Sequence, residues 1–256
     1  MKIFKTLPGL MLMLTFLVAP GCGSSIFDSV ENKESDEAVA FEVSKRLDEG
    51  DYAYVLSQGA DADPIDYAAA ALGAAGIDIA SMVSSLTNAS DSTSLDSIFA
   101  MTSDTDSLDE LNDSKSYLED ALAADPDNSA LSLQLTMVSL AVVTTSIGQV
   151  ADNNSVSGVD TSDGLDATEL AALGTTIGGA ADDSDTTKVD TTGDGVADTQ
   201  LATIVGTGIT GVSDNVADSG VGDSGIGEVA SGATDALAGT DGVVTNADIS
   251  TYLSGI

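Results

Sequence analysis

The chain contains no histidine and no tryptophan, and its 256 residues include a single cysteine, Cys22. Without histidine it lacks the side chain used most often as a general base near neutral pH. One cysteine cannot form a disulfide within the chain, and the missing histidines also exclude the usual zinc ligand sets. Carboxylate chemistry is left, but no Asp or Glu pair stands out among 42 acidic residues. We therefore expect no enzyme, with catalysis by carboxylates as the remaining alternative.

Basic side chains are also scarce, with seven Lys and Arg residues and a formal net charge of −35. Such a chain repels the phosphates of nucleic acids and of anionic lipid headgroups, so neither is an expected partner. Self-repulsion of this size opposes a compact state unless cations screen it. Three explanations stay open: the chain binds divalent cations, works in salty water, or is partly disordered.

The acidic residues are mostly aspartate, because Asp outnumbers Glu by 33 to 9. Glu is the better helix former, whereas Asp prefers helix caps and turns. The bias therefore indicates many loop and cap positions, or cation ligands, more than charged helix faces.

The N-terminal segment is the most informative part of the chain. Two lysines precede an apolar run from Leu10 to Val18, and the small residue Gly21 precedes Cys22. This order is typical of a secretory signal, and the run is shorter than the roughly 20 apolar residues that a membrane span needs. The segment resembles the lipobox of bacterial lipoproteins, in which the cysteine is diacylated and becomes the new N-terminus. It is formed by Leu17-Val18-Ala19-Pro20-Gly21-Cys22.

The lipobox resemblance implies a signal peptide over residues 1–21, lipid attachment at Cys22 and a polar tether over 22–36. Two positions depart from the pattern, since Ala19 replaces the usual Leu and Pro20 is unusual. No Asp follows the cysteine as an inner-membrane retention signal, which implies an outer-membrane lipoprotein of the cell envelope, facing the periplasm or the surface. Since the mature chain would be still more acidic, the lipid must hold it at the membrane, at about 0.8 kcal/mol per buried methylene. An ordinary cleaved signal with a nearby cysteine is the alternative.

Residues 37–151 are predicted to form an α-helical domain. Pro64 suits a first helical turn, Ser107 with Glu110 has the spacing of a capping box, and residues 125–128 (Asp-Pro-Asp-Asn) predict a turn. Apolar residues recur at near-helical spacing in 37–50, 52–56, 64–76, 77–86, 95–101, 107–122 and 129–151.

The segment 129–151 carries no charge. A transmembrane helix is one interpretation, but ten of its 23 residues are Ser, Thr, Gln or Gly, which is too polar for a span. We predict a helix that is buried on most sides. The alternation of Leu131, Leu133 and Leu135 would also suit a strand at its start.

Residues 117–128 resemble the end of a tetratricopeptide repeat, with Ala121 as the small residue between two helices and Pro126 as the turn proline. Gly50-Asp51-Tyr52 and Leu72-Gly73 resemble other parts of that repeat, without a clean 34-residue period. The resemblance covers about 40–130. It implies an array of helical hairpins, a fold that usually presents a groove to peptides or partner proteins. A generic helical bundle is the alternative.

Composition changes after Asp152. Residues 152–256 hold 18 of the 26 glycines, one basic residue and one aromatic residue, which argues against a large core there. Asp-Gly loops followed by short apolar segments recur near residues 160, 190 and 241. We predict an acidic, Gly-rich region over 152–256 that is partly helical or disordered and contains loop–helix repeats.

These loops resemble the EF-hand loop and its dockerin and thrombospondin type 3 relatives, in which alternate oxygen ligands surround calcium and a glycine permits the sharp turn. Leu201 stands where the second copy should have its last acid, which would weaken binding. Ordinary Asp-Gly turns are the alternative. The resemblance implies these ligands: Asp190, Thr192, Asp194, the Val196 carbonyl and Asp198 in the second copy, and Asp241 and Asp248 in the third.

The sequence thus predicts a mainly α, lipid-anchored cell-envelope protein, with a helical-hairpin array or bundle followed by the acidic region. We expect it to bind or assemble a protein partner in the envelope without catalysing a reaction. The alternative is a calcium-binding surface lipoprotein whose acidic tail becomes ordered with the metal.

Overall fold

The structure is a computed structural model, and it forms two compact units, residues 1–42 and 43–256. The first unit contributes only the beginning of one helix to the described part. Cys22, the predicted tether up to residue 35, most of the predicted helix at 95–101, and Asp241 lie outside the described residues. Those described are 36–88, 99, 106–161, 164–181, 183–216, 218, 232, 234–235, 237 and 243–255.

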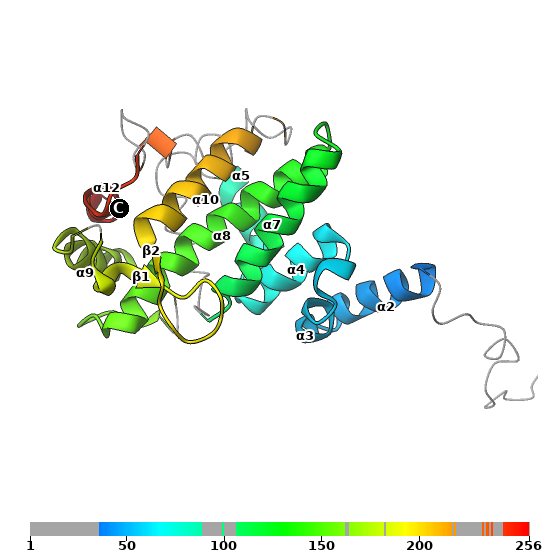
Figure 1. Ribbon diagram of the computed structural model, residues 1–256, viewed down its shortest axis with the longest axis horizontal. Coiled ribbons are helices and arrows are strands. Elements are labelled where there is room, and N and C mark those ends of the chain that lie inside the picture. Colours follow the sequence, from blue (N-terminus) through cyan, green and yellow to red (C-terminus); the bar gives the residue numbers. More distant parts are fainter. Residues whose placement is uncertain are drawn as a thin grey trace, which may run out of the picture. The chain divides into compact units, whose positions relative to one another are not determined.

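The described chain is mainly helical, as predicted (Figure 1). A short antiparallel pair, β1 (Lys188–Val189) with β2 (Thr199–Gln200), places Lys188 opposite Gln200. The helices are α2 (Asp36–Asp48), α3 (Tyr52–Leu56), α4 (Pro64–Ala74), α5 (Ile79–Asn88), α7 (Leu108–Ala124), α8 (Ser129–Asn154), α9 (Ala167–Gly178), α10 (Leu201–Val216) and α12 (Asn246–Gly255). The short elements are the 3₁₀ turns η2 (Gly59–Asp61) and η4 (Asp185–Thr187), and the strands β1 (Lys188–Val189) and β2 (Thr199–Gln200).

Asp and Asn side chains begin several helices, which explains part of the Asp bias. The Asp63 carboxylate accepts a hydrogen bond from the Ile65 N–H, 2.9 Å away, with Pro64 in the first turn of α4. Asn128 caps α8, and Asp166 forms a capping box at the start of α9. These side chains satisfy backbone N–H groups that have no partner within the helix.

The predicted capping box at Ser107 is wrong. Ser107 precedes α7, but its side chain makes no capping hydrogen bond. Its backbone has φ −87° and ψ 17°, outside the extended region that an N-cap residue normally adopts. The side chain is instead buried.

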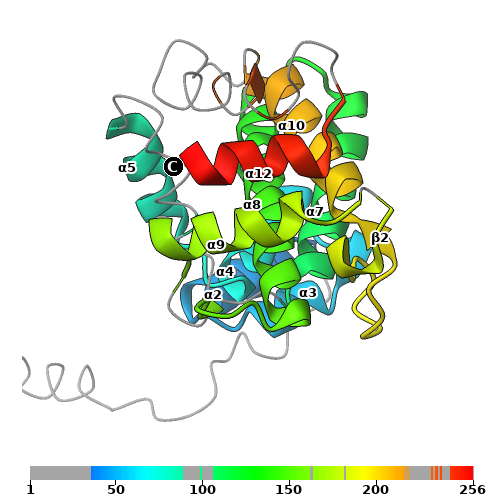
Figure 2. The same cartoon turned by 90° about the vertical axis from the view of Figure 1, so that its left-hand side faces the viewer.

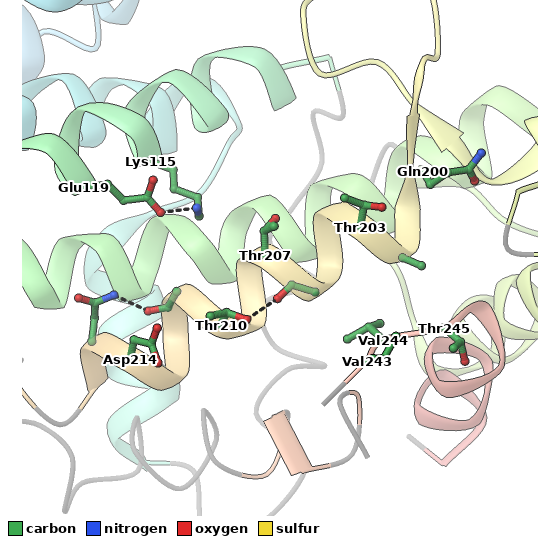
Figure 3. A pocket seen from close by; sticks show the side chains of 14 residues that line it. Lys115, Glu119, Gln200, Thr203, Thr207, Thr210, Asp214, Val243, Val244 and Thr245 are labelled. Atoms are coloured by element: carbon green, nitrogen blue, oxygen red, sulfur yellow. Dashed lines mark hydrogen bonds and ion pairs between the residues drawn. The ribbon is translucent and has the colours of Figure 1, made fainter. Parts of the chain in front are cut away.

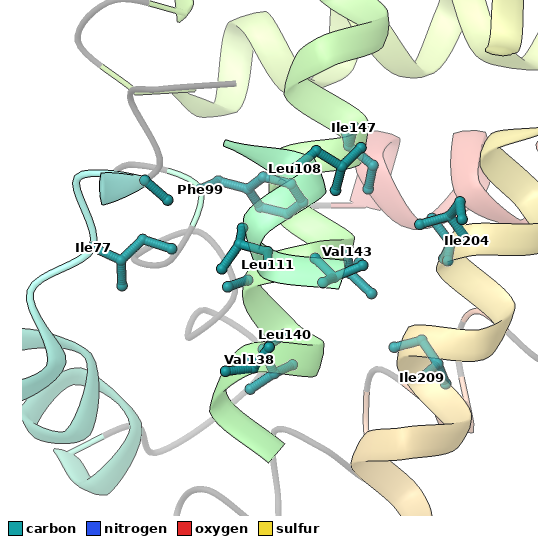
Figure 4. Packing of buried hydrophobic residues seen from close by; sticks show 14 of the residues in the cluster. Ile77, Phe99, Leu108, Leu111, Val138, Leu140, Val143, Ile147, Ile204 and Ile209 are labelled. Carbon is teal, nitrogen blue, oxygen red and sulfur yellow. The ribbon is translucent and has the colours of Figure 1, made fainter. Parts of the chain in front are cut away.

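The long helix α8 is the centre of the second unit, and the prediction of a buried helix is confirmed (Figure 4). Helices α7 and α10 pack against it. Some of its buried hydroxyls donate to carbonyls one turn earlier, such as Thr136 to Ser132 at 2.8 Å, whereas the buried hydroxyls of Ser139 and Thr145 have no hydrogen-bond partner among the described residues. The first turns are helical, so the alternative strand at Leu131–Leu135 does not form.

By length and composition alone α8 could cross a membrane, with a mean hydropathy of 1.7 over its most apolar window. However, 89% of that window is buried inside the protein. This is the pattern of a core helix, because the apolar side chains already have protein partners.

The expectation of little core beyond residue 152 is wrong. Helix α10 packs on α8, and α9 lies beside α12 (Figure 2). Thirteen apolar residues of this region are buried in the main core: Leu165, Leu170, Leu173, Ile177, Val189, Leu201, Ile204, Val205, Ile209, Val212, Leu237, Ile249 and Leu253.

Two glycines of this region allow its helices to approach their neighbours closely. A Cβ added at Gly178 would lie 2.4 Å from Ser250 Oγ, and one added at Gly208 would lie 2.6 Å from Val143 Cγ2. Gly178 is the last residue of α9 and Gly208 lies inside α10, and both permit close helix crossings. The second unit spans Val43–Ile256, and α8 continues through residues 151 and 152, where a domain boundary was predicted.

Candidate functional site

The predicted calcium loop, residues 190–198, joins β1 to β2, so a strand precedes the helix that was expected to follow the loop directly. The Asp190 carboxylate organises the loop. Its Oδ1 accepts the N–H groups of Thr192 at 3.0 Å and Gly193 at 2.9 Å, and its Oδ2 accepts that of Gly195 at 2.6 Å. Gly193 and Gly195 have φ values of 69° and 80°, which glycine adopts without strain.

These hydrogen bonds keep Asp190 ionised. Partial burial raises the pKa of its carboxyl group, but the N–H groups of Thr192, Gly195 and Gly193 outweigh burial and hold the pKa below its ordinary value. The root of the loop is attached to the core by Gln149 of α8. Its Oε1 accepts the Asp190 N–H at 2.6 Å, and its Nε2 donates to the Asp190 carbonyl at 3.4 Å.

The other predicted ligands of this loop bond to their neighbours in the chain. Asp194 Oδ1 accepts the Val196 N–H at 2.9 Å, and Asp198 Oδ1 accepts the Thr199 hydroxyl at 2.9 Å. The side chains of Asp194, Val196 and Asp198 are exposed. Within the part of the chain that the structure describes, no three His, Cys, Asp or Glu side chains converge on a point that could hold a metal ion.

Of the two predicted ligands of the third copy, the structure describes Asp248. Asp241 is outside the described residues. Asp248 lies in the first turn of α12, where its carboxylate accepts the Thr245 N–H at 2.9 Å and the Thr245 hydroxyl. Asp248 therefore caps the N-terminus of α12.

A second candidate site is a groove along the exposed side of α10, with a volume of about 700 Å³ (Figure 3). None of its residues was predicted as functional. Helix α7 contributes Lys115 and Glu119, and the segment before α12 contributes residues 243–245. The remaining lining comes from Gln200 and from α10: Ala202, Thr203, Gly206, Thr207, Thr210, Gly211, Asp214 and Asn215.

The floor of the groove is rich in hydroxyl groups and glycine backbone. Thr203, Thr207 and Thr210 follow one another at helical spacing and are exposed. The Thr207 and Thr210 hydroxyls each donate to a carbonyl of α10 at 2.9 Å, so their lone pairs remain available to accept hydrogen bonds. The site suits a ligand with N–H donors.

One end of the groove is charged. Lys115 forms an ion pair with Glu119 one turn further along α7, and Asp214 lines the same groove from α10. No motif in the sequence indicated this arrangement, because the three residues lie on two helices that are distant in the chain. A groove was expected on residues 40–130, whereas this one lies mainly on α10.

Two carboxyl groups with changed acidity lie outside the groove. Burial raises the pKa of Asp66 on α4, with a further contribution from Asp63, and burial beside Asp109 raises the pKa of Asp113 on α7. The Tyr67 pKa is also raised, first by burial and then by Asp113. Neither Asp66 nor Asp113 lines the groove.

Comparisons of the chain with protein families, with curated proteins and with solved structures gave no match.

Proposed function

We propose that this chain is a lipid-anchored binding or assembly protein of the bacterial cell envelope, and that the groove on α10 holds a segment of a protein partner. The observation that carries the proposal is the groove itself, which is open to solvent and lined by hydroxyl, amide, carboxylate and aliphatic groups. Such mixed surfaces provide hydrogen bonds to a bound chain and apolar contact to its side chains. We propose no catalytic step for it.

The N-terminal helices of the second unit are proposed to form a degenerate tetratricopeptide-like array. The pairs α3–α4, α4–α7 and α7–α8 pack against one another, and α5 lies between α4 and α7 in the chain. The Tyr52 ring lies on Gly73, where an added Cβ would be 2.3 Å from the ring. This contact joins the two segments that resemble the repeat, and it supports a hairpin built from them.

Photocrosslinking tests the groove directly. A benzoylphenylalanine at Thr207, which is exposed in the groove, is expected to give a discrete crosslinked product in intact cells. The matched control places the same group at Ala171, which is exposed on α9 and outside the groove. Equal products from both positions, or none from Thr207, would contradict a binding groove.

The lipid anchor has its own test. Cys22→Ser is expected to abolish fatty-acid labelling and to release or mislocalise the protein, because the thiol is the proposed attachment point. Labelled palmitate followed by membrane fractionation measures both effects. Wild-type labelling no higher than that of the variant would contradict lipidation.

Calcium binding by the 190–198 loop is the second candidate function. The observation in its favour is the loop conformation, with Asp190 ionised at its centre and left-handed glycines at 193 and 195. We propose Asp190, Asp194 and Asp198 as ligands, with Thr192 and the Val196 carbonyl. Affinity is expected to be about 10⁻⁴ to 10⁻³ M, as in extracellular modules.

Proteolysis separates this site from charge screening. Millimolar calcium is expected to protect the tail of the wild type, and Asp194→Ala is expected to remove the protection. Any divalent ion would relax repulsion in so acidic a chain, so magnesium is the control, since it prefers a smaller octahedral shell. Equal protection by both ions, undiminished in the variant, would leave no specific site.

A further inference from the structure

We propose that the groove on α10 takes an extended protein segment bearing a Lys or Arg side chain, which lies at the end formed by Glu119 and Asp214. This inference rests on the proposed binding function and specifies the chemistry of the partner. It follows from three properties of the groove: its charge, its hydrogen-bonding groups and its length.

The charge at this end is negative. Lys115 is the only basic residue among those that line the groove, its side chain is 15% exposed, and it already pairs with Glu119. The Glu119 side chain is 47% exposed, so it can accept further hydrogen bonds from solvent or from a ligand. With Asp214 exposed on α10, this end of the lining holds two carboxylates and one ammonium group that is already paired.

A basic side chain is the complement to this arrangement. It would restore neutrality at the Glu119–Asp214 end, where an Arg guanidinium or a Lys ammonium group would donate to a carboxylate. The net charge of −35 strengthens the attraction at long range and favours fast association with a basic partner.

The hydrogen-bonding groups suit a peptide backbone. The exposed hydroxyls of Thr203, Thr207 and Thr210 run along the groove. The oxygens of these hydroxyls can accept hydrogen bonds from the backbone N–H groups of an extended segment. Gln200 and Thr245 add polar groups to the lining.

The length of the groove sets the size of the segment. Thr203 and Asn215 are separated by 12 residues of α10, or about 18 Å at 1.5 Å per residue. An extended chain rises about 3.3 Å per residue, so five or six residues would span this distance. This is a typical length for a short segment docked in a groove.

The test is selection from a phage library of random heptapeptides on the full chain purified in detergent. Enriched peptides are expected to carry a Lys or Arg at one preferred position. A synthetic copy of the most enriched peptide, labelled with fluorescein, is expected to bind about fivefold more weakly to Asp214→Asn, as for the loss of one exposed ion pair. Thr207→Trp, which fills the groove, is expected to abolish binding.

Asp127→Asn is the matched control, because Asp127 is exposed in the turn between α7 and α8 and does not line the groove. It removes the same charge and is expected to leave affinity unchanged. Equal weakening by both variants would show general attraction to a polyanion and overturn the inference. Enrichment without a basic preference, or no enrichment, would overturn it as well.

The crosslinking result separates the two proposals. A partner that crosslinks at Thr207 while selected peptides lack a basic residue would leave the binding function standing and remove this inference. Absence of any crosslink at Thr207 would remove the binding function itself.

Discussion

Leu140→Asp is expected to leave the second compact unit largely unfolded at pH 7. Leu140 is fully buried in α8, within the main core (Figure 4). Replacing a buried Leu by Ala already costs about 2–5 kcal/mol, and a buried carboxylate without a partner adds a further penalty. Their sum is comparable to the whole stability of a typical domain, about 5–15 kcal/mol. Circular dichroism during thermal unfolding measures the effect.

Ala130→Asp is the matched control on the same helix. Ala130 is exposed in the first turn of α8, where a negative charge is favourable, so the melting temperature is expected to change little. Burial would also raise the pKa of an Asp at position 140, so the variant should regain stability as pH falls and the carboxyl group becomes neutral. An unchanged melting temperature for Leu140→Asp at pH 7 would mean that α8 is not buried in solution.

Gly208→Ala is expected to destabilise the contact between α10 and α8. The new Cβ would lie 2.6 Å from Val143 Cγ2 and 3.2 Å from the Ser139 carbonyl oxygen. The Val143 methyl group is itself packed in the core, and the carbonyl belongs to the backbone of α8, so the two helices must separate. Overpacking of this kind costs about 1–3 kcal/mol, which exceeds the gain of up to about 1 kcal/mol from replacing a helical glycine. The midpoint of urea unfolding measures the difference.

Gly206→Ala provides a control two residues away on the same helix. Its Cβ would meet Val244 Cγ2 at 3.6 Å, an ordinary van der Waals distance. Here only the gain in helix propensity remains, so stability is expected to stay unchanged or to rise by up to about 1 kcal/mol. If both variants changed the urea midpoint equally, the close crossing at Gly208 would be contradicted.

Local patterns in the sequence predicted most helices of the N-terminal half. The segment 52–56 became α3 with the same bounds, and Pro64 begins α4 as expected. The uncharged segment from residue 129 became α8, which continues three residues beyond the predicted end to Asn154. These predictions rest on interactions within about one turn of helix, namely capping, proline geometry and apolar spacing, so the sequence alone contains the necessary information.

The exception at Ser107 shows the limit of local rules. Ser107 and Glu110 have the spacing of a capping box, yet the serine side chain is buried and makes no capping bond. Packing around the start of α7 decides its backbone conformation, and the motif cannot report that packing.

The calcium ligands illustrate a different limit. The spacing of Asp190, Thr192 and Asp194 predicts alternating oxygens around an ion. In the structure Asp190 bonds to the backbone of its own loop, while Gln149 of α8 holds the loop from the other side. The contribution of Gln149 could not be predicted, because it lies 41 residues away in the sequence.

The sequence by itself determined that this chain is acidic, mainly helical and without histidine chemistry, because composition and short-range periodicity are properties of neighbouring residues. Only the tertiary structure decided what the glycines of the tail do. In the sequence a glycine indicates a turn or flexibility, but Gly178 and Gly208 permit close approach only because Ser250 and Val143 lie opposite them. The groove has the same origin, since Lys115, Asp214 and Val244 form one surface only after α7, α10 and the segment before α12 have packed together.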